Sequence, residues 1–136
     1  MKPTIINPEQ LGAPSGFSHG VLAPAGRTLY VAGQIGDHAD GSLDESFVDQ
    51  FDQALSNVLT VVAAAGGNAE SVVRLTTYVV NRTDYLDNLK SLGVVYRSHM
   101  GRHFPAMALV QVAGLVEAGA LLEIEATAVI AEGVAS

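Results

Sequence analysis

The chain has 136 residues, of which 49% are hydrophobic and 15% are charged, and its net charge at pH 7 is −7. A chain of this length can bury roughly two thirds of the surface that it exposes when unfolded, which predicts one domain over residues 1–136. The negative charge and the seven scattered Lys and Arg residues argue against nucleic acid as a partner, and the absence of cysteine excludes disulfides and thiolate chemistry.

The N-terminal region predicts three short strands. The first is expected at residues 5–6, before a loop over 8–16 that is rich in Pro and Gly. Strands at 19–23 and 28–32 flank a Pro-Ala-Gly turn signal at 24–26, so we expect these two strands to pair as a β-hairpin.

A polar loop over residues 36–42 precedes the first predicted helix. Apolar residues then recur at the spacing of a helix, and Gly66-Gly67 marks its end. The residues that define this apolar face are Phe47, Phe51, Ala54, Leu55, Val58, Leu59 and Val62.

The second half of the chain predicts a strand, a helix and two more strands. Residues 72–80 alternate as expected for a strand, and Thr83 is a plausible N-cap of a second helix that ends at Gly101. Two apolar strands follow at 107–113 and 120–130. The order β, β, β, α, β, α, β, β predicts an α+β fold with two helices on one face of a sheet.

The other face of that sheet needs a cover, and the composition favours a second copy of the chain. The charged fraction of 15% lies below the ~25% typical of soluble domains, as expected if surface is buried between subunits. No uninterrupted apolar run is long enough to cross a bilayer, and the N-terminus lacks an apolar signal core. We therefore expect a cytoplasmic, self-associating protein with no membrane partner.

Three segments in the right order resemble the RidA/YjgF family of reactive-intermediate deaminases. They are Ala32-Gly33-Gln34, Phe104-Pro105-Ala106 and Glu123-Ile124-Glu125-Ala126. The resemblance covers nearly the whole chain. It implies a chorismate-mutase-like fold, with a six-stranded mixed sheet and two helices, and a homotrimer with clefts between subunits. It also implies hydrolysis of imines and enamines without a cofactor.

Glu123 and Glu125 point to the same face of the last predicted strand, because they are two residues apart. The resemblance places the acid/base glutamate at Glu123, and a partly desolvated carboxylate suits proton transfer near neutrality. A solvated strip or an outward salt bridge is the alternative for both residues. We favour that alternative for Glu125 and the catalytic role for Glu123.

Met107 departs from the family pattern. The family's deaminases carry an arginine there, which clamps a substrate carboxylate through a bidentate pair. Its loss should cost roughly 2 to 5 kcal/mol, which predicts a weakly charged substrate unless Arg102 or His103 substitutes. The alternative for Met107 is simple filling of the core.

Other predicted pocket positions also lack the polar groups that the family carries. Phe17 stands where a tyrosine is usual, Ala32 where a serine is usual, and Leu109 where a cysteine is common. Gly33 would let the backbone approach a ligand or relieve packing, and Gln34 would position water or satisfy backbone groups. The predicted substrate-binding residues are Phe17, Ala32, Gly33, Gln34, Met107 and Leu109.

Neither a metal site nor a cofactor site is predicted. His99 and His103 lie on either side of Gly101, which should break the helix needed to align them. Asp37, His38 and Asp40 lack the spacing of a calcium loop, and no glycine-rich phosphate loop occurs. His19 is the histidine nearest the expected cleft, although a structural role suits it as well.

Three functions remain open from the sequence. The leading hypothesis is a homotrimer that hydrolyses a small, weakly charged imine or enamine in a cleft between subunits, with Glu123 activating water. The second is a trimeric small-molecule-binding or chaperone-like protein without turnover. RNA cleavage is the third, and the acidic composition with few aromatic residues disfavours it.

Overall fold

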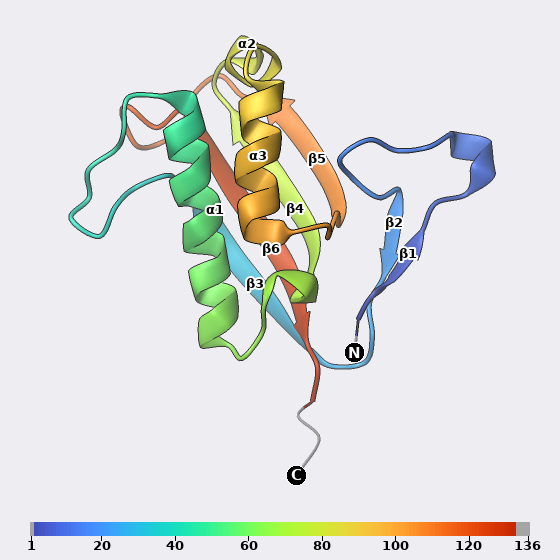
Figure 1. Cartoon of the computed structure of the whole chain (residues 1–136). Coiled ribbons are helices and arrows are strands. Elements are labelled where there is room, and N and C mark those ends of the chain that lie inside the picture. Colours follow the sequence, from blue (N-terminus) through green and yellow to red (C-terminus); the bar gives the residue numbers. More distant parts are fainter. Residues whose placement is uncertain (1, 133–136) are drawn as a thin grey trace.

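A computed structural model describes residues 2–132, so the ends of the predicted domain lie outside the described residues. Its centre is a mixed four-stranded sheet in the order β3-β6-β4-β5 (Figure 1). The strands are β3 (Arg27–Gln34), β6 (Leu122–Ile130), β4 (Val72–Val79) and β5 (Ala106–Gln111). Strand β6 pairs antiparallel with both β3 and β4, whereas β4 and β5 run parallel.

Helices α1 (Phe47–Ala64) and α3 (Leu89–Met100) pack on the same face of this sheet (Figure 1). The α+β fold with a mixed sheet and helices is therefore confirmed. No helix within residues 2–132 combines the length and the apolar character needed to cross a lipid bilayer.

Local sequence signals set the ends of these helices. Ser46 caps α1, because its side chain accepts a hydrogen bond from the backbone N–H of Asp49 at 3.0 Å. The predicted N-cap at Thr83 is wrong. The Asn81 side chain instead accepts from the Thr83 N–H at 2.9 Å and starts a short helix, α2 (Arg82–Leu86), before α3 begins. Gly101 ends α3 as predicted, with a positive φ of 61°.

The predicted hairpin and the single six-stranded sheet are also wrong. Strand β2 (Gly20–Leu22) pairs with β1 (Thr4–Ile6) in a separate two-stranded sheet, and β3 pairs with β6 (Figure 1). Just before β2, the Ser18 N–H donates to the Pro105 carbonyl at 3.1 Å and fixes this arm beside β5. The long ladder with β6 thus outweighs the local turn signal at 24–26.

The core lies between the two helices and the sheet, and it is apolar as the helical and strand periodicities predict. Along β6, alternate residues are buried against the helices, and those between them face the opposite side of the sheet. The largest fully buried apolar side chains include Leu55, Val58, Val62, Val72, Val79, Leu122 and Ile124.

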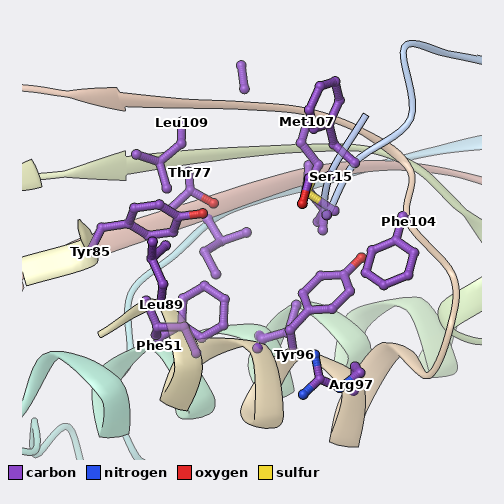
Figure 2. Close-up of a pocket in the computed structure, with 18 residues that line it drawn as sticks. Ser15, Phe51, Thr77, Tyr85, Leu89, Tyr96, Arg97, Phe104, Met107 and Leu109 are labelled. Carbon is purple, nitrogen blue, oxygen red and sulfur yellow. The ribbon is translucent and has the colours of Figure 1, made fainter. Parts of the chain in front are cut away.

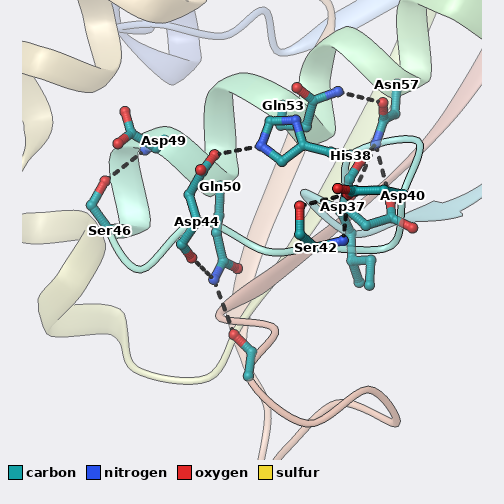
Figure 3. A network of polar contacts seen from close by, with 12 residues as sticks. Asp37, His38, Asp40, Ser42, Asp44, Ser46, Asp49, Gln50, Gln53 and Asn57 are labelled. Carbon is teal, nitrogen blue, oxygen red and sulfur yellow. Dashed lines mark hydrogen bonds and ion pairs between the residues drawn. The ribbon is translucent and has the colours of Figure 1, made fainter.

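Gln50 of α1 is a buried polar anchor that joins two loops near the start of β6. Its side chain donates to the carbonyls of Asp44 at 2.8 Å and Gly119 at 3.0 Å. It also accepts from the Leu121 N–H at 2.8 Å. Figure 3 shows the contact of Gln50 with Asp44 beside the contacts of the loop that follows β3. Because Leu121 directly precedes β6, the network fixes the position of Glu123, two residues further on.

Candidate functional site between two sheet faces

Glu123 lies on the face of the four-stranded sheet that α1 and α3 do not cover, here called the open face. The open face carries Glu123, Glu125 and Thr127 of β6, which alternate with buried residues, and their β4 neighbours Thr76 and Tyr78. The Glu123 side chain lies directly over Gly33 of β3. A Cβ atom at Gly33 would come within 2.6 Å of Glu123 Cδ and 2.9 Å of Oε2. Gly33 is therefore the residue that lets this carboxylate occupy its place.

Glu125 is held in a different way. The Tyr78 hydroxyl donates to Glu125 Oε1 at 2.7 Å, although Tyr78 stands opposite Glu123 in the strand register. This hydrogen bond raises the pKa of Tyr78 above its ordinary value, with smaller contributions from desolvation and from the charges of both glutamates. Within residues 2–132 no comparable hydrogen bond occupies the Glu123 carboxylate. Glu125 is thus engaged by its neighbour, whereas Glu123 is available.

A cavity of about 570 Å³ lies on the other face of the sheet, beneath α3 (Figure 2). Met107 and Leu109 of β5 form its strand wall, because they pair with the helix-facing residues Leu75 and Thr77 of β4. Phe17 reaches it from the loop before β2. Most of its remaining wall is aromatic or aliphatic, as expected for a pocket that takes an apolar group.

The predicted site residues therefore fall into two groups. Glu123 and Gly33 meet on the open face, whereas Phe17, Met107 and Leu109 line the cavity on the helix-covered face. One copy of the chain does not bring these groups together, because the sheet separates them.

Ala32 and Gln34 flank Gly33 at an irregularity in the pairing of β3 with β6. The Gln34 amide donates to the Ala32 carbonyl at 3.1 Å. The side chain of Gln34 therefore satisfies a backbone group, which is one of the two roles predicted for it.

Neither predicted substitute for the family arginine lines the cavity. His103 Nε2 lies 2.6 Å from the Val72 carbonyl oxygen, so this ring nitrogen is occupied, and Arg102 lies on the exposed turn after α3. The cation in the cavity wall is instead Arg97 of α3. The sequence analysis missed Arg97, and its only local signal is Gly93, one helical turn earlier.

Two aromatic residues that the sequence analysis does not predict as site residues, Tyr96 and Phe104, also line the cavity. Tyr96 stacks on Phe104 with a centroid separation of 5.3 Å and an interplanar angle of 12°. The Tyr96 hydroxyl donates to the His103 carbonyl at 2.6 Å, and burial raises the pKa of Tyr96 well above its ordinary value. This pair forms part of the cavity wall.

The histidines are engaged separately rather than gathered. His99 contacts Asp52 of α1, and His38 Nε2 lies 2.9 Å from Asp44 Oδ2. His19 Nε2 lies 3.1 Å from the Gly12 carbonyl oxygen, and its ring meets Phe17 edge-on. Over residues 2–132, no group of three or more His, Asp or Glu side chains is arranged to hold a metal ion.

Comparison with known proteins finds relatives over nearly the whole chain. A family model described as Endoribonuclease L-PSP matches residues 8–130. The 2-iminobutanoate/2-iminopropanoate deaminase of Homo sapiens is 35% identical over 120 residues, covering 87% of this chain and 82% of that protein. The protein of the same name from Rattus norvegicus is 36% identical over 124 residues, covering 90% and 83%.

Solved structures agree with these relatives. YyfB from Yersinia pestis, described as a protein of unknown function of the conserved Rid protein family, gives a TM-score of 0.85 at 38% identity. The likeness covers 96% of this chain and 100% of that one. E. coli TdcF with bound serine gives a TM-score of 0.70 at 27% identity, covering 88% and 92%. Residues 8–130, which the family model matches, include the strands that carry Glu123 and Met107.

Proposed function

The chain belongs to the RidA/YjgF superfamily, and from that premise we propose that it hydrolyses small imines and the enamines in equilibrium with them. Water adds across the C=N bond, and the products are a carbonyl compound and ammonia. Deaminases among its relatives, at 35% and 36% identity, support this reaction type. The observation that carries the proposal is the carboxylate of Glu123, held over Gly33 and engaged by no partner within its own described chain.

Glu123 acts as the general base and then as the general acid. Its carboxylate takes a proton from water as the oxygen bonds to the electrophilic imine carbon, and the C=N π electrons move to nitrogen. Starting from the protonated imine, the resulting carbinolamine has a neutral amino group, which receives the proton from Glu123. The C–N bond then breaks and ammonia leaves, while the hydroxyl group gives its proton to the Glu123 carboxylate and the C=O bond forms. Ammonia takes that proton from Glu123 and departs as ammonium, which restores the carboxylate. A protonated imine is already electrophilic, so this route uses no metal or cofactor.

A second copy of the chain completes the site in this proposal. The open face of one subunit, with Glu123, would lie against the edge of a neighbour that opens into the cavity lined by Met107. The exposure of Tyr30 (79%) and Val110 (44%) on the strands of the open face supports such an interface. A homotrimer is the arrangement that the sequence resemblance implies, and it would place three such clefts around its axis.

The strand wall of the cavity favours an apolar, weakly charged part of the substrate. Met107 offers no cation at the position where the resemblance implies an arginine, and Leu109 extends the same apolar wall. The prediction of a weakly charged substrate rests on residues of β5 alone. The wall formed by α3 also includes Arg97, whose side chain is exposed.

RNA cleavage is not proposed, despite the description of the family model. The chain carries fourteen acidic and seven basic residues, so its field repels a phosphate backbone. The open face adds the carboxylates of Glu123 and Glu125 to that field. Binding without turnover stays the second candidate, because the large apolar cavity is suited to hold a ligand whether or not Glu123 acts on it.

The test is the substitution Glu123→Gln, with Glu125→Gln as the matched control on the same strand. Ammonia release above the uncatalysed rate is followed with freshly generated 2-iminopropanoate and with an imine of an uncharged ketone. We expect Glu123→Gln to lower kcat/KM by about 100-fold or more, and Glu125→Gln by less than about 10-fold. Analytical ultracentrifugation checks that both variants keep the assembly of the wild type.

Two outcomes would contradict the proposal. Unchanged turnover in Glu123→Gln would remove this residue from the mechanism. Failure of the wild type to accelerate hydrolysis of any imine, together with ligand density in the cavity, would favour the binding protein instead.

A further inference from the structure

We infer that Tyr78 is a positioning residue for Glu123, because it holds the neighbouring carboxylate of Glu125 aside and so leaves Glu123 free to act on water. This role rests on the proposed function, since it takes Glu123 to be the base. Tyr78 is not among the site residues that the family resemblance implies, and Glu125 itself takes no part in the chemistry.

The two glutamates of the open face lie close enough to influence each other. They are two residues apart on β6, so their Cα atoms are about 6–7 Å apart, and both side chains leave the same face of the strand. Two like charges at such a distance favour a state in which one carboxyl group keeps its proton. A protonated Glu123 cannot take a proton from water, so Glu125 opposes the base unless its side chain is held away.

Each carboxylate meets a different neighbouring strand. Glu123 lies over Gly33 of β3, where a Cβ atom would come within 2.6 Å of its Cδ. Glu125 is bound from β4, since the Tyr78 hydroxyl donates to its Oε1 at 2.7 Å. Strand β6 lies between β3 and β4 in the sheet. These contacts therefore engage the two carboxylates from opposite sides of their own strand.

Tyr78 reaches Glu125 along a diagonal. In the register of β4 and β6, Tyr78 stands opposite Glu123, whereas Thr76 stands opposite Glu125. A diagonal contact of this kind is within the reach of a long aromatic side chain. The hydrogen bond to Glu125 is the main cause that raises the pKa of Tyr78, and the charges of Glu125 and Glu123 both add to it. The phenol is therefore close to both carboxylates and binds that of Glu125.

Arg74 is the alternative partner for Glu125 on the open face. With Glu125 and Tyr30, it lines a small hollow of about 160 Å³. None of the ion pairs within residues 2–132 joins Arg74 to Glu125, so the described contact that holds Glu125 is the Tyr78 hydroxyl. If Arg74 could hold a released Glu125 carboxylate just as well, loss of that hydroxyl would leave Glu123 unaffected.

The first experiment compares imine hydrolysis in Tyr78→Phe, in Glu125→Gln and in the double variant. Tyr78→Phe keeps the ring and releases the Glu125 carboxylate, so kcat/KM at pH 7 should fall by about 10-fold. Glu125→Gln removes the opposing charge. The double variant should therefore match Glu125→Gln alone, which means that the second substitution rescues the first. A merely structural role of Tyr78 predicts losses that add instead.

Tyr30→Phe is the matched control, because it makes the same change at another tyrosine of the open face. Tyr30 stands opposite Thr127 in the register of β3 and β6, and its substitution should leave kcat/KM within about 2-fold of the wild type. The phenylalanine keeps the ring that the proposed interface would bury. Analytical ultracentrifugation and urea unfolding check that every variant retains its assembly and its fold.

The hydrogen bond itself is tested without turnover. In protein with 13C-labelled tyrosine, the NMR signal that is lost in Tyr78→Phe identifies Tyr78, and its alkaline titration is then followed. Because Glu125 is the main cause that raises the pKa of Tyr78, Glu125→Gln should lower this pKa toward its ordinary value. An unchanged pKa would show that Tyr78 does not bind Glu125 and would overturn the assigned role.

The kinetic outcomes separate the role of Tyr78 from the proposed function. If Glu123→Gln lost activity but Tyr78→Phe did not, the proposed function would stand and the role of Tyr78 would fall. Additive losses in the double variant would have the same meaning. A wild type that hydrolyses no imine would overturn both, whereas rescue of Tyr78→Phe by Glu125→Gln is the expected result.

Discussion

The two faces of the four-stranded sheet have different roles. Residues on the helix-covered face form the core, whereas residues on the open face include the candidate catalytic carboxylate. On the helix-covered face of β6, Leu122 and Ile124 are 0% and 1% exposed and pack in the core. On the open face, Glu123 and Glu125 occupy the positions between and after them. Because side chains alternate along a strand, neighbouring positions of β6 serve different purposes. Substitutions one residue apart should therefore change different observables.

Leu122→Ala should give the largest effect, and the effect should be on stability. Removing most of a fully buried side chain leaves a cavity between β6 and the helices, so the free energy of unfolding should fall by about 2–5 kcal/mol. Urea unfolding at a fixed protein concentration measures this loss. Thr127→Ala, on the open face of the same strand, should change it by less than about 1 kcal/mol. Equal losses of unfolding free energy at the two positions would contradict the view that the helix-covered face of β6 supplies most of its stability.

Gly33→Ala should act on the chemistry of the open face. Its methyl group would come within 2.6 Å of the Glu123 carboxyl carbon, and the flexible end of Glu123 can move aside at little cost to the fold. A displaced general base should lower kcat/KM by about 100-fold in the ammonia-release assay.

Gly114→Ala is the matched control for Gly33→Ala, because a Cβ there would meet nothing within 4 Å. It should keep full activity. If Gly33→Ala kept full activity as well, the position of Glu123 over Gly33 would have no catalytic meaning.

The periodicity of apolar residues is enough to predict those features of the fold that involve a single helix or strand. The helical spacing of apolar residues predicted α1, and the alternation along 120–130 predicted β6 and the shared face of Glu123 and Glu125. Glycines at 66 and 101 marked the ends of α1 and α3. Each of these features depends on contacts or dihedral angles within a few residues, which the sequence displays directly.

The same periodicity does not predict which strands pair when they are distant in the sequence. The turn signal at 24–26 favoured a local hairpin, but β3 gains a longer ladder with β6 from the other end of the chain. Which faces the site residues occupy also depends on register across β4 and β5. The sequence predicts that Met107 and Glu123 share a cleft between subunits, but it does not show that they lie on opposite faces of the sheet within one copy, which follows from the pairing of β4 with β5 and β6.

Arg97 shows a similar limit for the site. An arginine near the end of an exposed helix is ordinary in sequence, and only the packing of α3 over the sheet places it at the cavity. The resemblance points to the turn after α3, where Arg102 and His103 are the predicted substitutes for the family arginine. The structure places Met107 in an apolar part of the cavity wall, whereas the presence of Arg97 in the same lining follows only from the packing of α3.

Tyr96→Phe should give the smallest loss of stability of the substitutions on the helix-covered face. At pH 7 the substitution removes the hydrogen bond from the Tyr96 hydroxyl to the His103 carbonyl, so the free energy of unfolding should fall by about 1 kcal/mol. The stacking on Phe104 is retained, because both rings have the same shape. Urea unfolding at pH 7 measures this difference.

The same pair of proteins should converge at alkaline pH. Burial raises the pKa of Tyr96 in the folded state above the ordinary value of 10.0, so above about pH 10 the unfolded chain releases a proton that the folded chain retains. The wild type therefore loses stability as pH rises through this window, whereas Tyr96→Phe has no such group to titrate. Urea unfolding from pH 8 to 11 should show the difference shrinking and then changing sign. A constant difference over that range would mean that the Tyr96 hydroxyl is solvated and that this part of the cavity wall is open to water.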